Sequence, residues 1–236
     1  MTKTLTLAAA LALGATAASA ASIKVETYTQ EAYQAYVAGA SRTVVEDFEN
    51  IVPSSREVPL VVSAVGTFDT LGGRGTGGSV IGTGKDLAVR TKGTTHFGRK
   101  NTTPGGQFYL DSNDTHGMMW NVGLADGAMF GSVAFSLSDA TDQGARLEIS
   151  AMGDVLDTLI GLPDMNLQFV VISFEDMIDS AMIKLTNRTG NGGLKTNDGF
   201  SIDDATVSVA AVPVPAAGLL LMGALGALGL RARRKA

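Results

Sequence analysis

Acidic residues gather near both ends of the central part of the chain, and they are the first candidates for chemistry. One group spans residues 46–49 and the other residues 198–204. Carboxylates that meet backbone carbonyls suit Ca²⁺, a hard cation that takes six to eight oxygen ligands. If the strands that carry the two groups are neighbours, their acids could approach one another. The predicted calcium ligands are Asp47, Glu49, Asp203 and Asp204.

The alternative for these acids is an ordinary solvated surface with turn caps, where Asp is common. Strand alternation over residues 202–209 places Ile202 and Asp204 on one face and Asp203 on the other. We therefore expect that the two neighbouring acids do not both face the core. An acid that does face inward needs a partner.

A further acidic loop, residues 138–144, has the D-x-x-D-x-G spacing of Asp139, Asp142 and Gly144. The spacing resembles a calcium turn but lacks the ligand run of an EF-hand. Because Asp and Gly are also the usual residues of tight turns, the favoured interpretation is a hairpin loop.

The residues needed for catalysis are sparse. The chain has no Cys and no G-x-S-x-G turn, and its two histidines, His96 and His116, lie in polar segments. A hydrolase site built from His116 with Asp111 or Asp114 is the weaker alternative to exposed loop histidines. Two histidines without a third close ligand also make a poor zinc site. We therefore expect no enzyme.

The glycine-rich segments are predicted to be loops. A G-x-G-x-x-G spacing occurs at Gly73, Gly75 and Gly78, but no helical pattern follows it, and Gly82–Lys85 lacks the remaining residues of a phosphate loop.

Aromatic residues near the middle of the chain suggest a second kind of site. Trp120 and Tyr109, with Phe97 and Phe108 nearby, could form a platform on which sugars stack, beside polar residues such as Asn101, Asn113 and Asp114. The alternative for Trp120, in an apolar sequence context, is a place in the core.

Short β-rich runs separated by Gly, Asn and Asp dominate the central part. Only residues 29–40 have helical spacing, with Thr29 as the expected N-cap and Gly39 as the stop. The fold class predicted is all-β, an antiparallel β-sandwich with a jelly-roll-like closure and one short N-terminal helix. The runs are residues 22–28, 43–49, 60–68, 87–91, 107–110, 117–122, 129–137, 145–151, 155–160, 167–174, 180–186 and 200–209.

The two ends of the chain differ from its centre. All 23 acidic residues lie between them, whereas five of the 18 basic residues lie in the ends, so the centre carries a net charge of −10. This charge disfavours nucleic acid and anionic lipid as partners of the centre. The three expected parts are a signal peptide (1–20), a β-sandwich domain (21–211) and a C-terminal segment (212–236).

The N-terminal end has the pattern of an exported protein. A basic start at Lys3 and an apolar run precede Ala18-Ser19-Ala20, which a signal peptidase accepts, so cleavage is expected before Ala21. The expected partners are the Sec export machinery and signal peptidase.

The C-terminal end combines three features in order. The motif Val212-Pro213-Val214-Pro215-Ala216 precedes an uncharged run to Leu230 and the cations Arg231, Arg233, Arg234 and Lys235. The run is about 22 Å long as a helix, short for a ~30 Å bilayer core, so it could span a membrane only with local thinning. The cations would stay in the cytoplasm.

These features resemble the PEP-CTERM class of bacterial sorting signals in the variant written VPLPA, with Val214 in place of Leu. The resemblance implies handling by an exosortase near Pro215 and Ala216, an inner-membrane intermediate, and then a place at the cell surface or outside the cell. The alternative is a C-terminal anchor that is never cut.

A second resemblance rests on Asp47-Phe48-Glu49 and on Asp198-Gly-Phe-Ser-Ile-Asp-Asp204. They are similar to the ends of jelly-roll domains in PEP-CTERM cargo proteins and carbohydrate-binding modules. The resemblance implies a structural calcium on Glu49 and Asp204, with Asp47 and Asp203 less directly matched. The expected function is an exported, non-catalytic surface protein of the envelope or extracellular matrix, with a calcium-stabilised carbohydrate-binding module as the alternative and a secreted hydrolase third.

Overall fold

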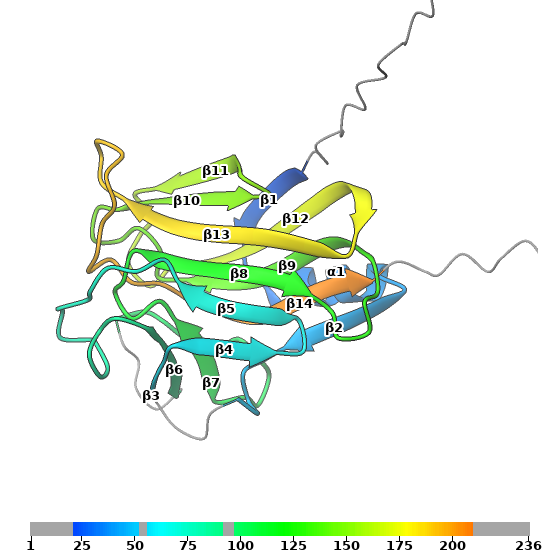
Figure 1. Cartoon of the computed structure of the whole chain (residues 1–236), viewed down its shortest axis with the longest axis horizontal. Helices are drawn as coiled ribbons and strands as arrows, with labels where there is room; N and C mark the ends of the chain where they lie inside the picture. Colours follow the sequence, from blue (N-terminus) through cyan, green and yellow to red (C-terminus); the bar gives the residue numbers. More distant parts are fainter. Residues whose placement is uncertain (1–20, 52–55, 92–96, 210–236) are drawn as a thin grey trace, which may run out of the picture.

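The computed structural model describes residues 21–51, 56–91 and 97–209 of the chain. In these residues fourteen strands form two antiparallel sheets and one helix lies outside them (Figure 1). The prediction of an all-β antiparallel sandwich with one short N-terminal helix is confirmed. The elements are β1 (Ala21–Thr27), α1 (Gln30–Gly39), β2 (Arg42–Glu46), β3 (Arg56–Val58), β4 (Leu60–Ser63), β5 (Gly66–Thr70), β6 (Leu87–Thr91), β7 (Phe108–Asp111), β8 (Gly117–Gly123), β9 (Phe130–Ser138), β10 (Arg146–Ala151), β11 (Asp154–Ile160), β12 (Leu167–Ile178), β13 (Ser180–Arg188) and β14 (Ser201–Val209).

Strand order explains how the two acidic groups come close. The larger sheet runs β1-β12-β9-β14-β7-β6-β3, and β2 also pairs with β14. Glu46 of β2 lies opposite Ala205 of β14, whereas β7 pairs with the start of β14 at Ser201 and Ile202. The condition for the two acidic groups to approach one another, that their strands are neighbours, is therefore met. The smaller sheet runs β11-β10-β13-β8-β5-β4.

Helix α1 covers the outer face of the larger sheet. The Thr29 hydroxyl accepts a hydrogen bond from the Ala32 backbone N–H at 3.1 Å, which confirms the predicted N-cap. Tyr33 is buried against Ala134 of β9 and Phe169 of β12. The helix is too short to be stable alone, so this aromatic contact holds it in place.

The main core lies between the two sheets, where the inward residues of each strand alternate with outward ones. Trp120 of β8 stacks on Phe68 of β5, with ring centroids 5.2 Å apart. Phe135 of β9 reaches the same indole edge-on from the other sheet at 6.2 Å. This contact joins the sheets at their centre.

Two local predictions were wrong. The run 60–68 is two strands, β4 and β5, because the chain turns at Ala64 and Val65 and enters β5 at Gly66, whose φ of 116° suits glycine. The acidic loop at 138–144 is not a hairpin, since β9 belongs to the larger sheet and β10 to the smaller one. It crosses from one sheet to the other at an end of the sandwich, and its acids therefore meet other loops.

Candidate functional site

Asp203 and Asp204 lie on β14 between the stretch that pairs with β7 and the stretch that pairs with β2. Asp204 has a φ of 50°, and the register with β9 shifts between Asp203 and Thr206. This bulge interrupts the alternation, so both acids are buried, with 0% and 2% of their surface exposed. The expectation that they do not both face inward was wrong, because it assumed a regular strand.

The neighbouring loop supplies donors to both carboxylates. Asp203 Oδ2 accepts hydrogen bonds from the backbone N–H groups of Thr102 at 2.6 Å and Thr103 at 3.1 Å. The hydroxyls of Thr102 and Thr103 donate to Asp204 at 2.9 and 2.6 Å, and Tyr28 donates to it at 3.4 Å. Asp203 and Asp204 together thus hold the loop before β7 in place.

Glu49 holds the other end of the same loop. Its Oε1 accepts hydrogen bonds from the backbone N–H groups of Gln107 at 2.6 Å and Phe108 at 2.8 Å. Asp47 accepts from the Glu49 N–H at 3.2 Å. Three of the four predicted ligands, Glu49, Asp203 and Asp204, therefore hold one loop, but within the described residues the four do not meet as a set of three or more ligand atoms. The calcium site at these acids stays a prediction.

Burial disfavours the charged forms of Asp203 and Asp204. Burial raises the pKa of Asp203 well above its usual value, and the Asp204 carboxylate raises it further. Burial also raises the pKa of Asp204, although the Thr103 and Thr102 hydroxyls oppose this shift. Both acids therefore favour the protonated form in the fold more than in the unfolded chain.

Replacement of Asp204 by Asn should flatten the pH dependence of the unfolding free energy. The contribution of Asp204 is fully present below about pH 4, near the pKa of Asp in an unfolded chain, and is lost as the pH rises through the raised folded pKa. Asn tolerates the left-handed backbone and removes the charge. Urea unfolding from pH 4 to pH 8 tests this, with Asp154→Asn, at an exposed acid of β11, as control. Equal profiles for wild type and Asp204→Asn would contradict it.

The predicted sugar platform at Trp120 and Tyr109 was wrong. Both side chains are fully buried, and the Trp120 indole N–H donates to the Val65 carbonyl at 3.0 Å inside the sandwich. Neither ring can therefore stack on a ligand. Of the aromatic residues considered with them, Phe97 is the one with a large exposed fraction, 63%.

Phe97 belongs to a pocket of about 230 Å³, which we call the loop-end pocket. Loops after β5, β6, β7, β9 and β13 build it, and the loops after β5 and β13 project on the left in Figure 1. Its walls combine an exposed ring, carboxylates, a guanidinium and amides, which is typical of sites for polar ligands. The lining residues are Gly77, Gly78, Ser79, Phe97, Arg99, Asp114, Asp139, Asp142, Gln143, Asn197 and Gly199.

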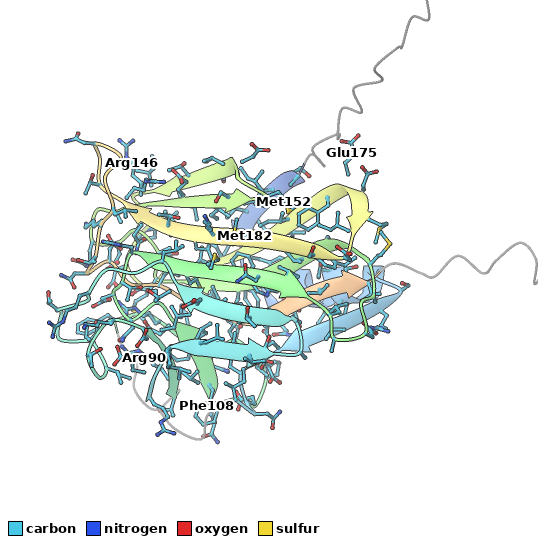
Figure 2. The ribbon with its side chains drawn as sticks, in the orientation of Figure 1. Arg90, Phe108, Arg146, Met152, Glu175 and Met182 are labelled. Carbon is cyan, nitrogen blue, oxygen red and sulfur yellow. The ribbon has the colours of Figure 1, made fainter. Side chains whose placement is uncertain are left out.

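A buried ion cluster underlies this pocket. Arg99 donates from Nη1 to both oxygens of Asp111 at 3.1 Å and from Nη2 to Asp114 at 2.5 Å. Arg90, labelled in Figure 2, also pairs with Asp111 and donates to the Ser79 carbonyl. These bonds tie the loops after β5, β6 and β7 together. The acids considered for a hydrolase with His116 are thus engaged by arginines.

Three carboxylates meet beside the pocket. One oxygen from each of Asp139, Asp142 and Asp164 lies within 4.8 Å of the others, and this acid triad could hold a metal ion. Burial raises the pKa of Asp139 to about 7, and the Asp142 carboxylate contributes to the shift. The D-x-x-D-x-G spacing in the sequence pointed to two of these three acids, Asp139 and Asp142. Asp164 comes from the loop before β12, and nothing in the sequence links it to the others.

Several predicted residues lie outside the described part of the chain. They are His96, Ala18 and Ala20 of the cleavage site, the motif Val212–Ala216 and the cations Arg231, Arg233, Arg234 and Lys235. Among the residues that the structure does describe, no helix has the length and apolar character needed to cross a membrane.

Comparisons with known proteins add little. No protein-family model matches the chain, and no curated protein matches it. Among solved structures, the chain is similar to a native structure of a family 35 carbohydrate binding module from Clostridium thermocellum. The identity is 13%, the match covers 72% of this chain and 100% of that chain, and the TM-score is 0.30. A TM-score this low carries no argument about ligand or activity.

Proposed function

We propose that this chain is an exported, non-catalytic β-sandwich protein that is sorted to the cell surface and acts in the envelope or the extracellular matrix. The observation that carries the proposal is the pair of sequence patterns that flank the sandwich. Lys3 and Ala18-Ser19-Ala20 precede it, and the Val212–Ala216 motif with its apolar run and cations follows it. The described sandwich includes Ala21, which pairs with Phe174 of β12, and Val209, which pairs with Phe130 of β9. The described strands therefore lie between the two predicted signals.

The intact mass of the protein recovered from the native cell surface tests this proposal. The expected mass corresponds to residues 21 to about 215, with or without an added group. Replacing both Pro213 and Pro215 by Ala should leave the tail attached, whereas Pro104→Ala, in an exposed loop of the sandwich, should not affect processing. A mass that still includes residues 216–236 in the wild type would instead support an uncut membrane anchor.

A second candidate function is carbohydrate binding with a calcium ion that stabilises the module. The observation in its favour is the loop-end pocket, where the exposed Phe97 ring stands beside hydrogen-bonding groups. A sugar could stack on this ring while its hydroxyls bond to the polar walls. The acid triad offers the oxygen ligands that Ca²⁺ prefers.

Replacing Phe97 by Ala should weaken polysaccharide binding about tenfold, a change of about 1.4 kcal/mol. Affinity gel electrophoresis with polysaccharide cast into the gel measures the effect. Met152→Ala is the matched control, because Met152, which is labelled in Figure 2, is also exposed (47%) but does not line this pocket. Equal retardation of Phe97→Ala and wild type would remove the ring from the site.

A further inference from the structure

An ion held by the acid triad would face the loop-end pocket. Asp139 and Asp142 line this pocket, whereas Asp164 does not. Three carboxylates offer at most six oxygens, and Asp139 Oδ1 already accepts a hydrogen bond from the Met165 N–H at 3.1 Å. Since Ca²⁺ takes six to eight oxygens, it would keep coordination positions free for a ligand. Because Asp139 and Asp142 line the pocket, we expect the free positions on the side of the pocket.

An N–H group without a hydrogen-bond partner also points to a ligand here. Arg99 is 4% exposed and lines the same pocket, and its Nε has no hydrogen-bond partner. This nitrogen forms an ion pair with Asp139 Oδ2 at 3.8 Å, a distance too long for a hydrogen bond. A buried donor without an acceptor is costly. A ligand hydroxyl could accept from Nε and donate to a carboxylate, because a hydroxyl does both.

The charge around the pocket selects among sugars. Arg90 and Arg99 compensate two of the five carboxylates in and beneath the pocket, and a divalent ion would compensate two more. The carboxylates are Asp111, Asp114, Asp139, Asp142 and Asp164. The remaining charge is negative, so an acidic sugar would be repelled.

We propose that the loop-end pocket binds a neutral sugar through a calcium ion held by Asp139, Asp142 and Asp164. A pair of neighbouring hydroxyls completes the coordination of the ion, Arg99 Nε donates to a ligand oxygen, and Phe97 receives a face of the ring. This inference rests on the carbohydrate-binding function proposed above. It adds that the ion is part of the binding site and that binding requires it.

Asp164→Asn is the informative variant, because it removes an ion ligand without altering the pocket lining. The full chain in detergent is titrated with Ca²⁺ by calorimetry and then run in gels that contain galactomannan, dextran or polygalacturonate, with Ca²⁺ or with EGTA. We expect the wild type to bind Ca²⁺ and to be retarded by a neutral polysaccharide only in Ca²⁺. Asp164→Asn should lose at least tenfold in both affinities, and Asp154→Asn should match the wild type.

Five results would overturn the inference. Equal retardation in Ca²⁺ and EGTA, or retardation of Asp164→Asn like the wild type, would leave carbohydrate binding intact but remove the ion from it. If Glu49→Gln lost its affinity for Ca²⁺ while Asp164→Asn kept it, the ion would bind at the acids of residues 47–49 and 203–204 instead of the acid triad. Stronger retardation by polygalacturonate would refute the selection for neutral sugars. No retardation under any condition would refute carbohydrate binding itself.

Discussion

Asp111→Ala is expected to lower the free energy of unfolding by about 3–5 kcal/mol, the usual cost of removing one partner of a buried ion pair. Asp111 is fully buried and pairs with both Arg90 and Arg99, which are themselves 0% and 4% exposed. Its loss would leave two buried guanidiniums without this carboxylate. The loops that carry them would lose their common attachment, so the loop-end pocket should lose its shape as well.

Urea unfolding followed by far-UV circular dichroism measures this effect. The control is Asp126→Ala, since Asp126 also pairs with an arginine, Arg42, but both side chains are 51% exposed. Exposed pairs contribute little to stability, so this control should unfold like the wild type. A similarly small change for Asp111→Ala would show that the buried cluster contributes little to stability.

Trp120→Ala should be comparably destabilising, by about 3–5 kcal/mol, because it leaves a large cavity in the core. The indole is fully buried, contacts Phe68 and Phe135 from opposite sheets, and donates to the Val65 carbonyl. A loss of glycan binding in Trp120→Ala would therefore follow from unfolding and not from a missing contact with the sugar.

Circular dichroism during urea unfolding also measures this variant, because Trp120 is the only tryptophan and its fluorescence disappears with it. Trp120→Phe keeps most of the apolar volume and should lose clearly less stability. Phe97→Ala, at an exposed ring, should change stability by less than about 0.5 kcal/mol. If Trp120→Ala were as stable as Phe97→Ala, the packing described for the two sheets would be incorrect.

Local patterns in the sequence predicted most of the secondary structure. Thr29 marked the start of the helix because a capping hydroxyl is a local requirement, and alternating β-branched residues marked strands such as β2 and β14. The approach of β2 to β14 was considered as a condition for the acidic groups to meet. The division at Gly66 was missed, since one glycine in an apolar run does not show whether a strand bends or ends.

The site was less predictable because it depends on contacts between distant segments. The left-handed backbone at Asp204 arises where β14 changes partners from β7 to β2, which alternation cannot show. Arginine is ordinarily exposed, so nothing marked Arg90 and Arg99 as buried. Asp164 lies near Asp139 and Asp142 because the β9–β10 connection crosses from one sheet to the other, and the sequence does not show this crossing.

The direction of β14 determines how the molecule would carry mechanical load. Gly199 lines the loop-end pocket, and β14 starts two residues later and runs nine residues to Val209, a length of roughly 30 Å. A tail attached after Val209 would hold the sandwich at the end opposite the pocket, so the pocket would point away from the attachment surface. A pull on a captured ligand would then run along β14. This strand is hydrogen-bonded to β9 on one side and to β7 and β2 on the other, so the force would shear many backbone hydrogen bonds at once instead of breaking them one by one.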